Sequence, residues 1–287
     1  MAITYNNLYL DMRADLKKRG VEGAQLEARE ILCCAAGKTK EQFLRDLPLY
    51  VSEEVKQKAE KLLERRLAGE PVAYLVGEWE FYGIPLYVSS DVLIPRMDTE
   101  VLAERAIEKA RASGAGARVL DLCAGSGCIG IAVAVHVPES RVILGEFSED
   151  ALRICKQNVR RHDLNARVTC ASVNALEMPS STMWDFDVIV SNPPYIPTDE
   201  IETLEETVKG YEPWMALDGG IDGLDFYRFI AANWKNALCL GGSLLFEVGI
   251  GQAEDVADIL RNNGFEQVKI TADTQGIGRV VEGIING

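Results

Sequence analysis

The chain has 287 residues, of which 44 are Asp or Glu and 30 are Lys or Arg, so its formal net charge is −14. That length allows one large domain or two unequal ones, and it can bury a core without disulfides or metal. Proteins that track nucleic acid usually carry a basic surface, so we expect no free nucleic acid as a partner. Apolar runs stay shorter than a membrane span, so we expect no membrane association.

Cysteine and histidine usage indicates the compartment. The seven cysteines contain no Cys-x-x-Cys pair, and the only histidines are His136 and His162. We therefore expect neither a disulfide framework nor a metal site. Residues 1–18 lack the apolar core of an export signal. These features predict a cytoplasmic protein with reduced thiols, and we expect it to be a monomer.

The first quarter of the chain has a helical pattern. Apolar residues recur at helical spacing over 8–17, 26–32 and 55–67, and each run stops close to a glycine. We predict a small helical domain over residues 1–76, which packs on the rest of the chain or binds a partner. Residues 77–100 alternate aromatic and polar side chains around a Gly and a Pro, which is typical of a β-hairpin connector.

From about residue 101 to 287, short apolar strands alternate with helical runs. Such alternation predicts a mostly parallel, doubly wound sheet, that is, an α/β domain of Rossmann-like type. The strands are expected at Arg118–Leu122, Arg141–Gly145, Asp187–Val190, Gly242–Val248, Val268–Thr271 and Arg279–Glu282, with helices at Cys128–Val137 and Asp150–His162.

A glycine-rich loop follows the strand RVLDL. Gly125, Gly127 and Gly130 fit the pattern G-x-G-x-x-G between a strand and a helix. Glycines allow the tight turn and let a cofactor approach the backbone. Glu146 lies 21 residues after Gly125, at the end of the next strand, where an acid can accept hydrogen bonds from both ribose hydroxyls. The sequence therefore predicts an adenosine-type cofactor site.

The glycine pattern alone does not choose between NAD and S-adenosylmethionine. Asp121 ends the strand, four residues before Gly125. A carboxylate there can face the cationic amino group of methionine but would lie unfavourably close to a pyrophosphate. No downstream segment indicates hydride chemistry, whereas one indicates a methyl acceptor. S-adenosylmethionine is therefore the expected cofactor, with S-adenosylhomocysteine as its product.

The acceptor segment is Asn192-Pro193-Pro194-Tyr195, directly after the strand DFDVIVS. The prolines fix φ and hold Asn192 rigidly at the sheet edge. The Asn192 side-chain oxygen and the Pro193 carbonyl can each accept one hydrogen from a planar –NH2 group. Tyr195 offers an aromatic face to that plane.

Two acceptors and a ring select an amide of glutamine or asparagine, or the amino group of adenine or cytosine. Such nitrogens are poor nucleophiles because their lone pairs are delocalised. Hydrogen-bond acceptors stabilise the positive charge that builds on the nitrogen, and they orient it for in-line attack on a sulfonium methyl group.

At this point the chain resembles the HemK/PrmC family, the release factor glutamine (N5) methyltransferases, which modify the glutamine of the Gly-Gly-Gln motif in peptide chain release factors. The resemblance runs over essentially the whole chain. It rests on Pro71–Gly77, Glu80–Leu86, Leu93–Glu100, Asp121–Gly127, Ser191–Ile196, Glu212-Pro213, Ala216–Leu224, Gly241–Gly249 and Arg279–Gly283.

The resemblance implies a role for each motif residue. S-adenosylmethionine would be held by Asp121 near its amino group, by Glu146 on its ribose, by Asn192, and by the loop residues Cys123, Ala124, Gly125, Ser126 and Gly127. Asn192 and Pro193 would bind the substrate amide, Pro194 would make them rigid, and Tyr195 would pack on the amide plane. The N-terminal helices would help dock the release factor. Arg96, Thr99 and Glu100 would border the cofactor pocket.

Three positions depart from the family pattern. Met97 stands where a proline is usual, and Glu146 replaces the usual Asp at the ribose position. No acid is present around Ser172-Val173-Asn174, so Asn174 or a neighbour would hold the adenine amino group through an amide or backbone oxygen.

Alternatives remain open from the sequence. The same chemistry fits a ribosomal-protein glutamine or an adenine amino group in nucleic acid. A non-catalytic cofactor-binding adaptor and an NAD oxidoreductase are further possibilities. Glu247 ends a strand, and we interpret it as an acid whose hydrogen bonds are satisfied locally.

Overall fold

The structure is a computed structural model that describes residues 2–286, and the chain forms two compact units. The first unit contains residues 2–78 together with Glu206–Tyr211. The second contains residues 79–205 and 212–286. Within residues 2–286, no helix combines the length and the apolar character that a bilayer span requires.

The first unit is helical. The three predicted runs form α1 (Tyr5–Lys18), α2 (Ala24–Ala36) and α4 (Glu53–Leu67). The sequence pattern did not indicate the short helices α3 (Lys40–Asp46), α5 (Val72–Val76) and α9 (Glu206–Lys209). They are too short for a helical period to stand out. The Glu206–Tyr211 segment belongs to this unit although it is distant in sequence, and the Tyr211 hydroxyl donates to the Ala68 carbonyl at 3.3 Å.

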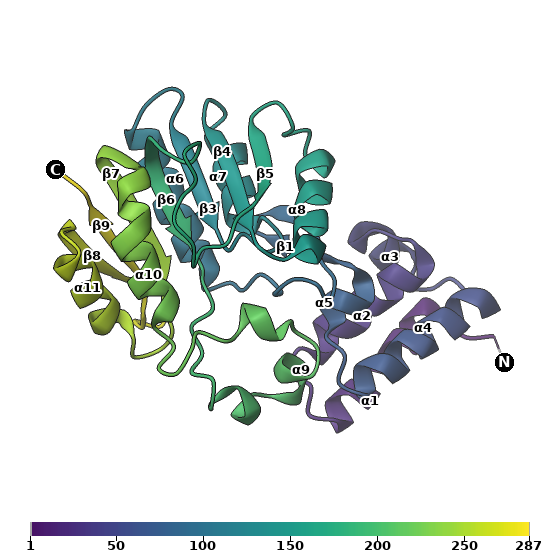
Figure 1. The fold of residues 1–287 in the computed structure, drawn as a ribbon. Coiled ribbons are helices and arrows are strands. Elements are labelled where there is room, and N and C mark those ends of the chain that lie inside the picture. The colour runs from purple at the N-terminus through teal and green to yellow at the C-terminus, as the bar shows by residue number, and fades with distance from the viewer. Residues whose placement is uncertain (1, 287) are drawn as a thin grey trace. The chain divides into compact units, whose positions relative to one another are not determined.

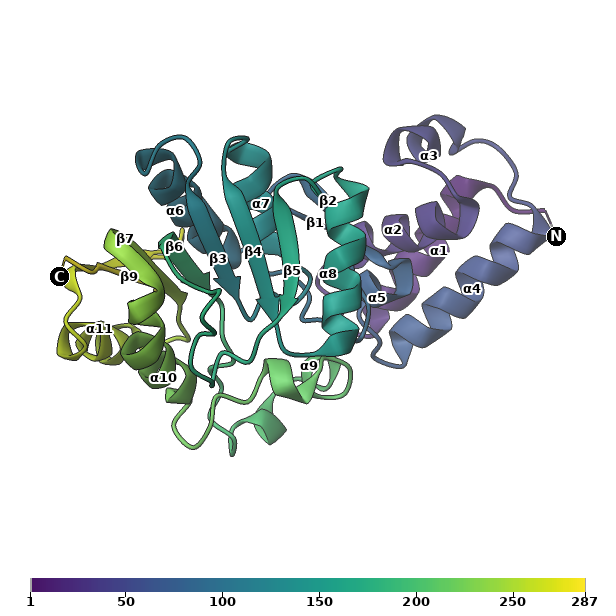
Figure 2. The ribbon, with the colours of Figure 1, turned by 45° about the horizontal axis from the view of Figure 1, so that its top comes forward.

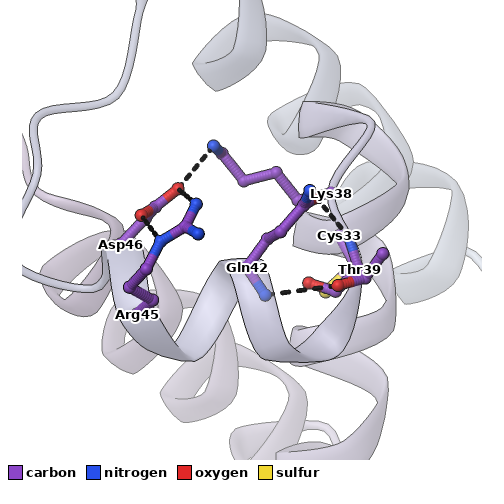
Figure 3. A network of polar contacts seen from close by, with 6 residues as sticks. All are labelled: Cys33, Lys38, Thr39, Gln42, Arg45 and Asp46. Atoms are coloured by element: carbon purple, nitrogen blue, oxygen red, sulfur yellow. Dashed lines mark hydrogen bonds and ion pairs between the residues drawn. The ribbon is translucent and has the colours of Figure 1, made fainter.

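Polar contacts at both ends hold α3 in place (Figure 3). Thr39 Oγ1 accepts from the Gln42 backbone, and the Gln42 side chain accepts from the Thr39 backbone, which makes a capping box. At the other end, Asp46 accepts from Arg45 and Lys38, and these hydrogen bonds lower the pKa of Asp46 to about 2. A seven-residue helix is unstable alone, so such caps decide whether it forms.

The β-hairpin predicted for the connector is confirmed. Strands β1 (Glu78–Phe81) and β2 (Ile84–Tyr87) pair in a two-stranded sheet. The two residues between them, Tyr82 and Gly83, have φ of 51° and 73°. Positive φ at both central residues is the signature of a type I′ turn, whose twist matches that of the strands.

The predicted parallel-rich α/β sheet is also confirmed. Seven strands lie in the order β5-β4-β3-β6-β7-β9-β8, and the first five are parallel while β9 and β8 run antiparallel to their neighbours. The strands are β3 (Arg118–Leu122), β4 (Arg141–Glu146), β5 (Val168–Ser172), β6 (Phe186–Ser191), β7 (Leu238–Glu247), β8 (Glu266–Ala272) and β9 (Gly278–Ile284). The sequence pattern did not indicate β5, because its side chains are mostly half-exposed and only Val168 is fully buried.

Helices cover both faces of this sheet, with α6 and α7 behind it and α10 in front in Figure 2, so the domain has three layers (Figure 1). One core lies under α6 (Thr99–Ala112), α7 (Cys128–His136) and α8 (Glu149–Arg161), and the other lies under α10 (Asp225–Asn233) and α11 (Ala253–Asn262). Within residues 2–286, three short 3-10 turns complete the secondary structure: Ile201–Thr203, Trp214–Ala216 and Trp234–Ala237. Alternate residues of one strand enter opposite cores, such as Val188 and Ile189 of β6.

Candidate active site

The carboxyl ends of four adjacent parallel strands meet at one edge of the large sheet. Leu122 of β3 pairs with Gly145 of β4 and with Ser191 of β6, and Ser191 pairs in turn with Phe246 of β7. The residues that follow, Cys123, Glu146, Asn192 and Glu247, therefore stand in one row. The chain reverses its winding between β3 and β6. Such a switch point is where open α/β sheets bind their ligands.

The glycine loop needs the residues that it has. Gly125 and Gly127 have φ of 55° and 83°, which side chains rarely tolerate. A Cβ on Gly130 would lie 2.2 Å from Cδ2 of Leu144, so α7 packs directly on β4 at this point. The glycines thus serve both the turn and the helix–sheet contact.

Asn158 of α8 anchors this loop, and sequence reasoning missed it. The side chain is fully buried, and its Nδ2 donates to the carbonyls of Ser126, at 2.9 Å, and Tyr87, at 3.0 Å. Its Oδ1 accepts from the Tyr87 backbone at 2.7 Å. One amide thereby joins the loop to the hairpin. An isolated Asn on a helix has no sequence context that would reveal this role.

Glu146 is fixed by backbone donors at the end of β4. Its Oε2 accepts from the Gly125 N–H at 2.8 Å, and its Oε1 accepts from the Ser148 N–H at 2.8 Å. Each carboxylate oxygen retains a lone pair for a further donor. Glu146 thus keeps acceptor capacity at the carboxyl end of β4, and its predicted contact with a ribose diol stays a prediction.

Asp121 lies near the end of β3, as predicted, and is buried there. Its carboxylate is fully buried and is not part of the cavity wall described below. Oδ2 accepts from the Gly130 N–H at 2.8 Å, while Oδ1 has no hydrogen-bond partner among the described residues. Burial raises the pKa of Asp121 to about 7, although the Gly130 bond acts in the opposite direction. The Gly130 bond ties the carboxylate to the start of α7, and the predicted contact of Asp121 with the cofactor amino group stays a prediction.

The acceptor segment 192–195 is held in place by close contacts with the segment 219–223 and with Gln252. A Cβ on Gly219 would lie 2.7 Å from Cα of Tyr195, and one on Gly223 would lie 2.3 Å from the Tyr195 carbonyl oxygen. The Gln252 side chain donates to the same carbonyl at 2.9 Å. The two glycines therefore allow the segment 219–223 to press against the acceptor segment, whose prolines already restrict it.

Glu247 differs from the local interpretation given above. It is 2 % exposed, and although its Oε1 accepts from the Tyr195 hydroxyl at 3.4 Å, Oε2 has no partner in the described part of the chain. Burial raises its pKa to about 7. Burial and the nearby carboxylate of Glu247 also raise the pKa of the Tyr195 hydroxyl, so this phenol stays protonated. The correction follows from desolvation, which the sequence does not display.

A cavity of about 430 Å³ opens along this row of strand ends, and every lining residue belongs to the second unit. Its size falls in the range of small-molecule sites. Eight predicted residues line it: Cys123, Ala124, Gly125, Ser126, Glu146, Asn174, Asn192 and Pro194. The other predicted residues, Asp121, Gly127, Pro193 and Tyr195, are not among the residues that line this cavity.

The charged side chains that line the cavity are all acidic. Asp91, Glu146 and Asp218 contribute carboxylates, and the described lining residues include no Lys, Arg or His. Such a wall suits a cationic ligand and opposes a pyrophosphate. The acidic charge of the wall therefore favours S-adenosylmethionine over a dinucleotide as the ligand.

Several wall residues had no sequence signal. Phe147 follows Glu146 and is 55 % exposed, and Trp214 and Met215 come from the irregular segment after the acceptor motif. Thr99, which the family resemblance placed at the pocket, does line the cavity, whereas Arg96, placed there too, pairs with Glu212 and is not among the lining residues. A long irregular segment has no period, so only its folded path shows which of its side chains reach a site.

Asn174 lies in the wall, but its side chain is already engaged. Oδ1 accepts from the Leu176 N–H at 3.0 Å, and Nδ2 donates to Glu177 at 3.1 Å. This local turn leaves one lone pair of Oδ1 and the backbone for a ligand. The predicted adenine contact through an amide or backbone oxygen thus stays a prediction.

The glycine loop, the acid Glu146 and the Asn-Pro-Pro-Tyr segment lie at one edge of a Rossmann-like sheet, and this arrangement is that of an S-adenosylmethionine-dependent methyltransferase domain. Residues 95–209 match the family described as "Methyltransferase small domain". A methyltransferase from Pyrococcus furiosus has the same fold, with a TM-score of 0.54 and 14% identity, and the match covers 79% of this chain and 100% of that one.

The particular family follows from closer relatives. Residues 8–77 match the "PrmC N-terminal domain". The release factor glutamine methyltransferase of Geobacter sulfurreducens is 41% identical over 95% of this chain and 94% of its own. That of Thermodesulfovibrio yellowstonii is 39% identical over 89% and 90%. The chain therefore belongs to the release factor glutamine methyltransferase family.

Proposed function

We propose that this protein transfers the methyl group of S-adenosylmethionine to the side-chain amide nitrogen (N5) of the glutamine in the Gly-Gly-Gln motif of peptide chain release factors. The observation that carries the proposal is Asn192, which lines the same cavity as the glycine loop and Glu146. The residue that would bind the substrate amide and the residues that would bind the cofactor thus line the same cavity. Membership of a family whose relatives are named for release factors supports the substrate.

The residues present fit the cofactor. The acidic wall suits a molecule that carries a sulfonium and an ammonium group, and Glu146 offers two oxygens to a ribose diol. Loop residues 123–127, Asn174 and Asn192 would complete the cofactor contacts. Asp121 would lie near the cofactor amino group while its Oδ2 accepts from the Gly130 N–H at the start of α7, which leaves Oδ1 for a further donor. The bound cofactor supplies an electrophilic methyl group.

The chain's own residues prepare the acceptor nitrogen. The Asn192 side-chain oxygen and the Pro193 carbonyl each accept a hydrogen from the glutamine –NH2 group, which aligns its lone pair with the methyl carbon. As the new bond forms, positive charge builds on nitrogen, and both acceptors stabilise it. Pro194 keeps this geometry rigid, and Tyr195 packs on the amide plane. The N–C bond would form as the sulfonium S–C bond breaks and S-adenosylhomocysteine leaves, and the methylated nitrogen would then lose its extra proton to solvent, so the attack itself needs no general base.

We assign the helical unit, residues 2–78 with Glu206–Tyr211, to docking of the release factor. The second unit carries the cavity on its own, so the helical unit is available for protein recognition. A bacterial release factor acts on cytoplasmic ribosomes, and we place the enzyme there as a monomer.

Labelled methyl transfer to a purified bacterial release factor tests the proposal. We expect label on the wild-type factor and none on a twin whose Gly-Gly-Gln glutamine is alanine. Label on neither factor, with binding of S-adenosylhomocysteine intact, would retain the cofactor and reject the substrate. Ribosomal proteins and RNA would then be assayed in the same way.

Replacing Glu146 by alanine is expected to weaken S-adenosylhomocysteine binding by about 100-fold. Two hydrogen bonds to a charged group are lost, and each contributes about 1.5–3 kcal/mol before the remaining contacts adjust. Titration calorimetry measures the change. The matched control is Glu149→Ala, which removes the same charge from an exposed site three residues away and should leave affinity within about twofold. Equal losses in both variants would show a general charge effect instead of a ribose contact.

A further inference from the structure

Three polar side chains link the end of β7 to the acceptor motif. Asn192 Nδ2 donates to Thr99 Oγ1 at 3.4 Å. Burial raises the pKa of the Glu247 carboxylate, and hydrogen bonds from the Thr99 and Tyr195 hydroxyls act in the opposite direction, with the Tyr195 hydroxyl 3.4 Å from Oε1. Thr99 and Glu247 are each 2 % exposed. These residues come from α6, β7 and the segment after β6, so only the fold brings them together.

The direction of the hydrogen bonds matters for the proposed chemistry. An ionised carboxylate only accepts, so the Thr99 proton points to Glu247 and the hydroxyl oxygen is left to accept. Thr99 Oγ1 accepts a hydrogen bond from the Asn192 –NH2 group, so the Asn192 side-chain oxygen is left facing the cavity. If the Asn192 side-chain amide were flipped, its –NH2 group would face the –NH2 group of the substrate glutamine, and two hydrogen-bond donors repel each other.

We propose that Thr99 and Glu247 are positioning residues that hold the Asn192 side-chain amide with its oxygen toward the acceptor glutamine. This inference rests on the proposed function, because it explains how that site distinguishes the two ends of one amide. The burial of Thr99 and Glu247 supports it, since buried polar side chains keep the hydrogen bonds that they make.

The pH dependence provides one readout. The pKa of Glu247, about 7, means that the carboxylate accepts above that pH and carries a proton below it. A protonated Glu247 can donate to Thr99, whose hydroxyl can then turn to the Asn192 oxygen. The rate constant kcat should therefore rise with pH through about 7. The titratable and charged groups facing Glu247 are Asp98, Tyr195, Arg279, Tyr227 and Cys128.

Thr99→Val removes the hydroxyl and keeps the side-chain shape. With saturating S-adenosylmethionine, we expect kcat toward the release factor to fall about tenfold or more, with KM and S-adenosylhomocysteine affinity within about twofold. Thr99→Ser, which keeps the hydroxyl, should stay within about threefold of the wild type. Glu247→Gln should lose the rise of kcat between pH 6 and 8. A wild-type kcat in Thr99→Val, or equal losses in Thr99→Val and Thr99→Ser, would overturn the inference.

A second measurement does not depend on the substrate. Hydrogen exchange of the Asn192 side-chain –NH2, followed by NMR in the S-adenosylhomocysteine complex, should be about tenfold faster in Thr99→Val than in the wild type or Thr99→Ser. Equal exchange rates would show that Thr99 does not hold the amide. If the wild type transfers no methyl group to the release factor, the proposed function fails, while this exchange experiment still decides the orientation of Asn192.

Discussion

Asn192→Ala is expected to lower the rate of methyl transfer to a release factor by about 1,000-fold, which corresponds to about 4 kcal/mol of transition-state stabilisation. The variant removes the side-chain oxygen that accepts from the glutamine amide, and Pro193 alone cannot align the nitrogen. The cavity wall at Glu146 and the glycine loop is unchanged. S-adenosylhomocysteine should therefore still bind within about tenfold of the wild-type affinity. Single-turnover transfer and calorimetry measure the two effects separately.

The control for this variant is Asn236→Ala. Asn236 is exposed, lies outside the cavity wall and donates to the Asn233 carbonyl. It should retain the wild-type rate. If Asn192→Ala also retains that rate, then the acceptor motif does not touch the reacting nitrogen, and a scaffolding protein that only binds the cofactor becomes the better explanation.

Gly223→Ala should have the largest effect on folding and activity together. Gly223 has φ of +72°, and an added Cβ would lie 2.3 Å from the Tyr195 carbonyl oxygen and 2.7 Å from Gln252 Nε2. The strained φ costs about 1 kcal/mol, and the clash adds about 1–3 kcal/mol because a backbone atom must move. We expect the free energy of unfolding to fall by about 2–4 kcal/mol. Displacing the acceptor segment by about 1 Å should lower the transfer rate by about 100-fold.

Gly276→Ala separates strain from contact. Gly276 has a similar φ of +82°, and no atom lies within 4 Å of the Cβ position. It should lose only about 1 kcal/mol of stability and none of its activity. Urea unfolding and initial rates measure both variants. Equal losses in the two would mean that backbone conformation, and not pressure on the acceptor segment, explains the effect of Gly223→Ala.

Local patterns predicted much of this protein. The glycine loop and the strand β3 before it are contiguous in sequence, and their spacing reflects turn geometry and side-chain alternation within a few residues. The rigid backbone of the acceptor motif 192–195 could also be predicted, because its two prolines restrict the conformations of the residues beside them. Glu146 could be placed because strand and helix lengths in such a unit vary little. The α/β class and the hairpin followed from the same periodicities.

Tertiary structure decided the environment of these groups. Asp121 and Glu247 are both strand residues in the sequence, and burial in the folded chain, together with neighbouring carboxylates, raises their pKa values to about 7. Thr99 reaches Asn192 across 93 residues of sequence, and Asn158 reaches Tyr87 across 71. No local pattern encodes such distances. The sequence by itself therefore determined which chemical groups the site contains, whereas packing of the strands and helices determined which of them meet, which are desolvated and which way their hydrogen bonds point.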